Sequence, residues 1–173
     1  MTLKVYGATQ SRAFRTVWMA EELGIPYEHV PVSPKEARNA EYLGLNPNGH
    51  VPFIEDDGVV LVESMAINLY LAAKYAPGLP APSRHLWPAS VEDQGRAYQW
   101  SVWAVTEVEG DLLTALLNRV LRAPDERDEG AAAAAAVRLE TPLRILDTSL
   151  GTGPFLAGEH FSVADLNVAA VLS

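Results

Sequence analysis

The chain contains no cysteine. Disulfide bonds, cysteine-type zinc sites and catalysis by a protein thiol are therefore excluded. Histidine is scarce as well, and the few histidines are scattered rather than grouped at helical spacing: His29, His50, His85 and His160. Because zinc and similar transition-metal sites are usually built from His and Cys side chains brought close together, we expect no bound metal.

Basic residues are also few, 13 Lys and Arg against 22 Asp and Glu, which gives a net charge of −9. They form no cluster, and without a positive surface we expect neither a nucleic acid nor a membrane as a partner. No segment reaches the ~18 uninterrupted apolar residues that a membrane span requires. The first ten residues, MTLKVYGATQ, do not resemble a signal peptide. We therefore expect a cytoplasmic protein.

Apolar residues make up 49% of the chain, and their spacing changes along it. Alternation predicts strands in the first part, whereas recurrence at helical spacing predicts helices between them. The predicted elements are a strand at 2–6, a helix at 11–24, a strand at 27–32, a weak helix at 35–44, strands at 51–55 and 59–62, and a helix from 64 to about 76. This βαβαββα order defines a first domain at 1–76.

The stretch APGLPAPSRHLWPAS has four prolines and no periodicity, which predicts a linker at 77–89. The chain beyond it has a helical pattern. Ser90 and Asp93 resemble a capping box, and the six alanines at 131–136 favour a helix. Pro142 should kink the following helix or start a new one.

The last stretch predicts a helix that begins at Ser162, with Asp165 three residues later as in a capping box. This helix is strongly apolar and needs a partner to cover it, yet the chain stops after Ser173. Residues 90–173 therefore predict an all-helical domain that is either incomplete at its C-terminal end or unusually small.

The stretch NPNGHVPFIEDDGVVLVES places Pro52 at the start of one apolar run and Glu63-Ser64 at the end of the next. A strand tolerates proline at its first residue, at an edge or at a bulge, and an X-Pro bond can also be cis. Asp-Gly between two apolar runs is a strong hairpin signal. Taken alone, the stretch predicts a plain hairpin.

The order of the elements, the stretch LGLNPNGHVPFIEDDGVVLVESMAINLYL and the closing FLAGEHFSVADL together resemble the glutathione S-transferase family. The resemblance covers essentially the whole chain. It implies a thioredoxin-like α/β N-terminal domain with a mixed four-stranded sheet, a linker and an all-α C-terminal domain. It further implies glutathione as co-substrate, no metal, and a homodimer with twofold symmetry.

The resemblance also assigns roles to the hairpin. The family's proline at the Pro52 position is cis, so Val51 would offer its backbone to the cysteinyl part of glutathione, like an added strand. Ser64 at a helix N-terminus would bind the γ-glutamyl carboxylate, and Glu63 would bind the ammonium of the same group. Without the Val-Pro pair, Ser64 would be interpreted as an N-cap and Glu63 as a solvated charge.

Theta-like members of the family place a serine at the Ser11 position, near the start of the first helix. A hydroxyl that donates to the sulfur, with a helix N-terminus behind it, favours the thiolate over the thiol, whose free pKa is ~8.5. Thr9 is a competing candidate, and Ser11 could instead only cap the helix. Tyr6 belongs to the strand by alternation, so we give it no catalytic role.

Lys35 and His50 are candidates for binding the glycine end of glutathione, although either could be an exposed surface residue. Glu107 matches an acidic residue that, in bacterial members, reaches the glutathione of the neighbouring subunit. Trp100 is expected in the core, and Trp103 is a candidate for the wall of the electrophile pocket.

The predicted function is conjugation of the glutathione thiolate to a small, hydrophobic electrophile, as in detoxification. One alternative is a noncatalytic glutathione-binding or interaction module, because a fold does not fix a function. Another is a glutathione-dependent isomerase, although the double-serine-plus-cysteine start of zeta-like isomerases is absent. Beta-type mixed-disulfide chemistry is excluded because the chain has no cysteine.

Overall fold

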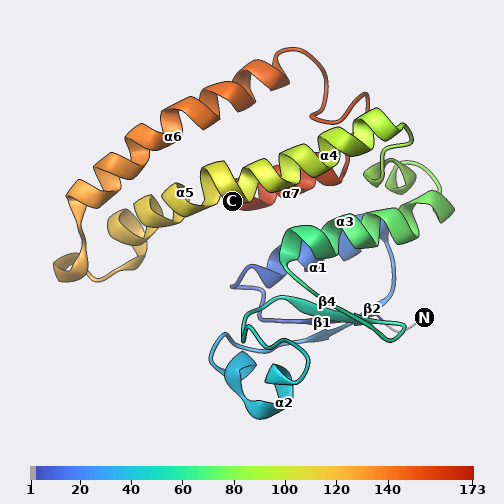
Figure 1. Cartoon of the computed structure of the whole chain (residues 1–173), viewed down its shortest axis with the longest axis horizontal. Coiled ribbons are helices and arrows are strands. Elements are labelled where there is room, and N and C mark those ends of the chain that lie inside the picture. Colours follow the sequence, from blue (N-terminus) through green and yellow to red (C-terminus); the bar gives the residue numbers. More distant parts are fainter. Residues whose placement is uncertain (1–2) are drawn as a thin grey trace. The chain divides into compact units, whose positions relative to one another are not determined.

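The computed structural model describes residues 3–173, and its internal contacts divide the chain into two units, Met1–Ala89 and Ser90–Ser173 (Figure 1). The first residue of the predicted strand at 2–6 lies outside the described residues. Each unit is described by itself below.

The first unit is a sheet with helices on both of its faces. Its strands and α-helices are β1 (Leu3–Tyr6), α1 (Ala13–Leu23), β2 (Tyr27–Val30), α2 (Ala40–Leu43), β3 (Phe53–Asp56), β4 (Val59–Val62) and α3 (Ser64–Tyr75). The strand order is β2-β1-β3-β4, with β1 and β2 parallel and the other pairs antiparallel. The predicted four-stranded mixed sheet is therefore confirmed.

Two apolar layers hold this sheet in place. Helices α1 and α3 pack against each other on one face, and α2 lies on the other (Figure 1). On the α2 side, Tyr6 stacks on Phe53 with ring centroids 4.5 Å apart, and Tyr42 packs against both rings. Val5 and Ile54, which pair across β1 and β3, are fully buried. The buried residues of the sheet therefore lie on its two central strands, β1 and β3, whereas β2 and β4 at the edges have none.

The β3–β4 hairpin turns at Asp57 and Gly58, whose φ angles are 49° and 87°. Two consecutive residues with positive φ match the type I′ turn that Asp-Gly favours. The prediction placed Asp56 in the turn as well. In the structure Asp56 stays in β3, opposite Val59, and its side chain is fully buried.

Residues 77–89 group with the first unit; one short 3-10 turn, at 76–78, overlaps their start, and a second lies at 83–86. Ser83 lies in the second of these turns, and its hydroxyl donates to the backbone oxygen of Glu22 at 2.9 Å. The proline-rich segment is thus tied to the end of α1.

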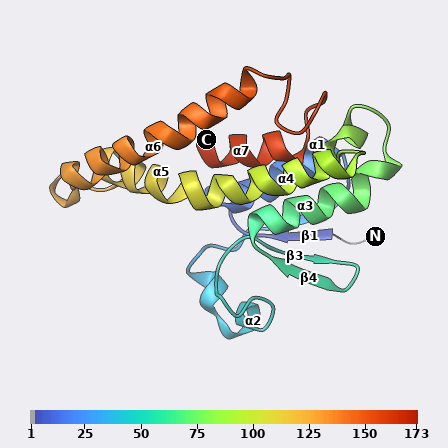
Figure 2. The ribbon, with the colours of Figure 1, turned by 45° about the horizontal axis from the view of Figure 1, so that its top comes forward.

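The second unit is entirely helical. Its elements are α4 (Val91–Trp103), a π-helical turn (Ala104–Val108), α5 (Glu109–Leu116), a second π-helical turn (Leu117–Leu121), a 3-10 turn (Pro124–Glu126), α6 (Glu129–Leu150) and α7 (Val163–Leu172). Helix α5 packs along α6, and α4 lies beside α7 (Figure 2). Within residues 3–173, no helix is both long and apolar enough to cross a bilayer.

The predicted helix starts of this unit are confirmed. Ser90 caps α4 by accepting from the backbone N–H of Asp93 at 3.1 Å. Ser162 and Asp165 form a capping box at the start of α7, in which the backbone N–H of Ser162 donates to Asp165 at 2.9 Å. Pro142 starts no new helix, because α6 continues through it to Leu150.

Candidate active site

The loop before β3 contains a cis peptide bond between Val51 and Pro52, as predicted. Buried Asn46 holds this loop from the inside. Its Nδ2 donates to the backbone oxygen of His50 at 2.8 Å, and its Oδ1 accepts from the backbone N–H of Asn48 at 3.1 Å. Val51 is half-buried and His50 is exposed, so the loop presents both residues at the surface of the first unit.

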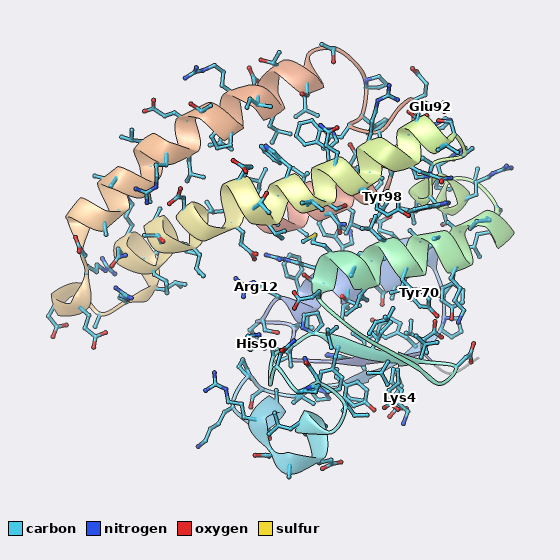
Figure 3. The ribbon with its side chains drawn as sticks, in the orientation of Figure 1. Lys4, Arg12, His50, Tyr70, Glu92 and Tyr98 are labelled. Atoms are coloured by element: carbon cyan, nitrogen blue, oxygen red, sulfur yellow. The ribbon has the colours of Figure 1, made fainter. Side chains whose placement is uncertain are left out.

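The loop between β1 and α1 meets the cis-proline loop at Gly7. A Cβ atom on Gly7 would lie 2.5 Å from the Cβ of Ala13 and 3.0 Å from the Cβ of Val51. Only glycine allows this approach, and its φ of 135° also lies outside the range that other residues favour. The start of α1, with Ser11 just before it, is thereby brought beside Val51. Figure 3 shows the neighbouring residues Arg12 and His50 at the same end of the first unit.

Ser11 lies one residue before the N-cap of α1, which is Arg12, so the prediction that Ser11 is the N-cap is wrong. Its hydroxyl nevertheless accepts from the backbone N–H of Ala13, the first helical residue, at 3.2 Å. It donates to the backbone oxygen of Ala8 at 2.6 Å. That oxygen also accepts from the Ser11 N–H at 3.0 Å, so it would keep a partner if the hydroxyl turned towards a ligand.

The β4–α3 junction places Ser64 as the first residue of α3, with Glu63 as its N-cap. Ser64 was interpreted as an N-cap in the alternative to ligand binding. That alternative is wrong by one position, because the N-cap is Glu63. Glu63 has φ 69° and ψ 111°, because the chain turns from strand to helix with no intervening loop. Such a conformation costs a non-glycine residue about 1–3 kcal/mol and is found most often at functional sites. Glu63 is exposed, whereas Ser64 is buried.

Arg15 was not among the predicted site residues, yet its side chain contacts that of Ser64. Its side chain is only 6% exposed, and its Nη1 lies 3.5 Å from the Ser64 hydroxyl. One signal in the sequence could have revealed it. Arg15, Met19 and Leu23 are four residues apart, and all three are buried on the same face of α1.

Arg38 is a second residue that the sequence analysis missed. A Cβ atom on Gly49 would lie 3.1 Å from the Cγ of Arg38, so the stem of this arginine packs against Gly49, the residue before His50. Lys35, which was predicted instead, is exposed at the N-cap of the 3-10 turn at 36–38. The binding role predicted for Lys35 stays a prediction, and Arg38 is a second basic residue near the same loop.

The hydroxyl of Tyr6 donates to Glu55 on the neighbouring strand. Burial, together with this carboxylate, raises the pKa of Tyr6 above its ordinary value. A phenol that is already committed to a carboxylate is a poor donor to a thiolate. The structural role predicted for Tyr6 within the strand is confirmed.

Glu107 and the two tryptophans belong to the second unit. Glu107 is exposed in the π-helical turn after α4. Trp100 is 6% exposed, which confirms its predicted place in the core, and Trp103 packs edge-to-face against it at 4.9 Å.

Comparison with known proteins gives a consistent result over the whole chain. Residues 1–73 match the sequence model of the glutathione S-transferase N-terminal domain, and residues 111–173 match that of the C-terminal domain. Glutathione S-transferase GstB of Escherichia coli K12 is 31% identical over 172 residues, which are 96% of this chain and 80% of that protein. Glutathione S-transferase 4 of Zea mays is 31% identical over 175 residues, covering 98% of this chain and 76% of the maize protein.

Solved structures agree with the sequence comparison. The theta class glutathione S-transferase of Xanthomonas axonopodis pv. citri, solved with glutathione bound, superposes with a TM-score of 0.85 at 31% identity. That match covers 96% of this chain and 78% of the Xanthomonas chain. Poplar glutathione transferase F1 gives a TM-score of 0.86 at 25% identity, over 99% of this chain and 79% of the poplar chain. The chain therefore belongs to the glutathione S-transferase family.

Proposed function

We propose that this protein conjugates the thiolate of glutathione to a small, hydrophobic electrophile, with Ser11 stabilising the sulfur. The main support is the position of the Ser11 hydroxyl. It accepts from the backbone N–H of Ala13, whose Cβ approaches Val51 across Gly7, and it has a proton that can be redirected without leaving the Ala8 oxygen unpaired. A glutathione-bound relative of the same fold adds support.

In this reaction the sulfur attacks an electrophilic carbon, and the thiol must lose its proton first. Lowering its pKa by ~2 units from ~8.5 requires about 2.7 kcal/mol of differential stabilisation. One charge-assisted hydrogen bond from Ser11, together with the N-terminus of α1, is of this size. The hydrogen bond from Ala13 N–H to the Ser11 oxygen polarises the hydroxyl and makes it a stronger donor.

The remaining groups would hold the peptide. The Val51 backbone would pair with the cysteinyl part, Ser64 would bind the γ-glutamyl carboxylate, and Glu63 would bind the ammonium. For the glycyl carboxylate we propose His50 together with Arg38, whose stem packs against the same loop, in preference to Lys35. The same proposal includes Pro52, which would shape this loop. It also includes a homodimer, in which Glu107 would reach the glutathione of the neighbouring subunit. The proposed setting of the reaction is detoxification in the cytoplasm.

Replacing Ser11 by alanine separates catalysis from binding. In Ser11→Ala, retention on glutathione resin should persist, because the contacts to the peptide backbone and γ-glutamyl end do not depend on the thiolate. Conjugation of a model aryl halide should fall by about one to three orders of magnitude, the scale for losing one donor to a developing anion.

Thr9→Ala is the matched control, because Thr9 is an exposed hydroxyl residue in the same loop. It should keep the wild-type rate. Loss of activity in Thr9→Ala but not in Ser11→Ala would give Thr9 the catalytic role. A wild-type protein that binds glutathione yet turns over none of several electrophiles would instead support a noncatalytic binding module.

A further inference from the structure

His29 is an exposed residue of β2, a strand at the edge of the sheet with no buried side chain, so core packing does not explain it. In the parallel ladder His29 lies opposite Val5, and both side chains therefore lie on the face of the sheet opposite to Tyr6 and α2. From there the ring reaches the loop that leads from β1 to α1. Its Nε2 lies 2.7 Å from the backbone oxygen of Gly7.

The direction of this hydrogen bond follows from its acceptor. A carbonyl oxygen only accepts, so the Nε2 of His29 carries a proton in this contact and donates it to Gly7. The neutral ring with its proton on Nε2 and the charged ring both make this bond. His29 therefore holds the loop in either charge state.

The peptide unit between Gly7 and Ala8 is held at both of its polar atoms. Its oxygen accepts from His29, and its N–H, which belongs to Ala8, donates to the backbone oxygen of Val32 at 2.9 Å. The N–H of Gly7 donates to the backbone oxygen of Val30, also at 2.9 Å. The start of the loop is thus fixed by β2 and the residues that follow it.

Gly7 is a position where the loop needs such a tether. Its φ of 135° and its close approach to Ala13 and Val51 require glycine. Glycine also has more backbone freedom than any other residue, so a loop that begins with it is loosely determined. The bond from His29 restricts the peptide that follows Gly7 and offsets this freedom.

The tethered peptide leads directly to Ser11. The next carbonyl along the chain, that of Ala8, accepts from the Ser11 N–H at 3.0 Å and from the Ser11 hydroxyl at 2.6 Å. A shift of the Gly7–Ala8 peptide therefore also moves Ser11. Since a catalytic donor must be held within about 0.5 Å of its productive position, a small shift is enough to weaken it.

We propose that His29 is a positioning residue for Ser11, which holds the loop at 7–12 in place through the backbone oxygen of Gly7. This inference rests on the proposed role of Ser11. In this role His29 binds neither glutathione nor the electrophile, and its effect reaches the sulfur only through the Ser11 hydroxyl.

Two amide variants that differ by one methylene group test this proposal. In His29→Gln the side-chain nitrogen can take the place of Nε2 and donate to Gly7, whereas the shorter side chain of His29→Asn cannot reach it. Turnover of a model aryl halide at saturating glutathione and about pH 6 should fall about three- to tenfold in His29→Asn and His29→Leu, the scale for losing one hydrogen bond. His29→Gln should keep at least about half of the wild-type turnover.

Glutathione affinity, measured by calorimetry, should stay within about twofold of wild type in all three variants, because the groups proposed to hold the peptide are untouched. The pKa of the bound thiol, followed by the ultraviolet absorbance of the thiolate, should rise by about half a unit to one unit in His29→Leu, which matches the expected loss of turnover. In a Ser11→Ala background, His29→Leu should change neither quantity further.

Glu28→Leu is the matched control for a changed surface on β2. Glu28 precedes His29, points to the other face of the sheet by alternation, and contacts only exposed Lys4 at 3.9 Å among the ion pairs of residues 3–173. This variant should keep the turnover and the thiol pKa of wild type. A loss as large as that of His29→Leu would show that any change to this strand lowers activity, and would overturn the proposal.

Equal turnover in His29→Gln and His29→Asn, or equal losses from His29→Leu in the wild-type and Ser11→Ala backgrounds, would also overturn the role of His29. The proposed function would stand in either case, provided that Ser11→Ala itself loses turnover. Wild-type turnover in Ser11→Ala would instead overturn the role of Ser11, so the two failures can be told apart.

Discussion

The two ends of α3 are both rich in polar groups but use them in opposite ways. At the C-terminal end, buried Asp56 accepts from Lys74 at 2.8 Å and from the Tyr75 hydroxyl at 2.7 Å. At the N-terminal end, Glu63 is exposed in a left-handed conformation and Ser64 contacts buried Arg15. The first N–H groups of the helix have no acceptor within it.

This difference separates stability from function along one helix. At the C-terminal end, Asp56, Lys74 and Tyr75 satisfy one another's hydrogen bonds, as expected of a group that ties the β3–β4 hairpin to α3. The Glu63-Ser64 end has a residue with positive φ and helix N–H groups without an acceptor in the helix, as expected of a group that binds a ligand. Changes at the two ends should therefore affect different properties of the protein.

The largest effect on stability is expected for Asp56→Ala. Removing a buried carboxylate leaves Lys74 and Tyr75 without this acceptor and should lower the free energy of unfolding by about 3 kcal/mol. Urea denaturation measures this change. Asp57→Asn is the matched control, because Asp57 contacts the same lysine from an exposed position and should change stability by less than about 1 kcal/mol.

The glutathione affinity of folded Asp56→Ala should equal that of wild type. A tenfold weaker affinity would mean that the two ends of α3 are coupled, and the comparison would fail.

Alkaline pH should reduce the stability that the groups at the C-terminal end of α3 contribute. Burial, with the neighbouring Asp56 carboxylate, raises the pKa of Tyr75 to about 12, and the bond to Asp56 raises the pKa of Lys74. Groups with a raised pKa in the folded state give stability that is complete below their unfolded pKa, near 10, and is lost as pH rises through the folded value.

The free energy of unfolding should therefore fall between pH 10 and 12, by about 2–3 kcal/mol from Tyr75. Tyr75→Phe should show a shallower decline, measured by urea denaturation at each pH. Identical declines in the two proteins would remove Tyr75 from the explanation.

The smallest effect is expected at Glu63. Glycine adopts a φ of 69° without strain, whereas alanine does not. Glu63→Gly should therefore be more stable than Glu63→Ala by about 1 kcal/mol in thermal denaturation. Both variants should bind glutathione more weakly and to the same extent, because both lose the carboxylate. A more stable alanine variant would show that the junction is not strained.

Most of the fold could be predicted from the sequence because its signals are local. Alternating apolar residues predicted the strands, Asp57-Gly58 predicted the hairpin turn, and the Ser162–Asp165 capping box predicted the start of α7. Pro142, which was expected to kink the helix or to start a new one, starts none, and α6 runs through it while packing against α5.

The candidate site was only partly predictable, because it depends on contacts between residues distant in sequence. Arg15 and Ser64 are 49 residues apart; the spacing of Arg15 with Met19 and Leu23 points to the buried face of α1 but does not show that this face meets the start of α3. Arg38 was missed for a similar reason, since its packing over Gly49 requires the loop to fold back. By contrast, the cis Val51–Pro52 bond was predicted from the family resemblance.

The most direct test of the account is the pKa of the glutathione thiol when it is bound to the protein. The ultraviolet absorbance of the thiolate, titrated against pH, measures it in wild type and in Ser11→Ala. In wild type the pKa should lie about 2 units below the free value of ~8.5, and in Ser11→Ala it should return towards that value while glutathione stays bound. A bound thiol with the same lowered pKa in both proteins would contradict the role given to Ser11.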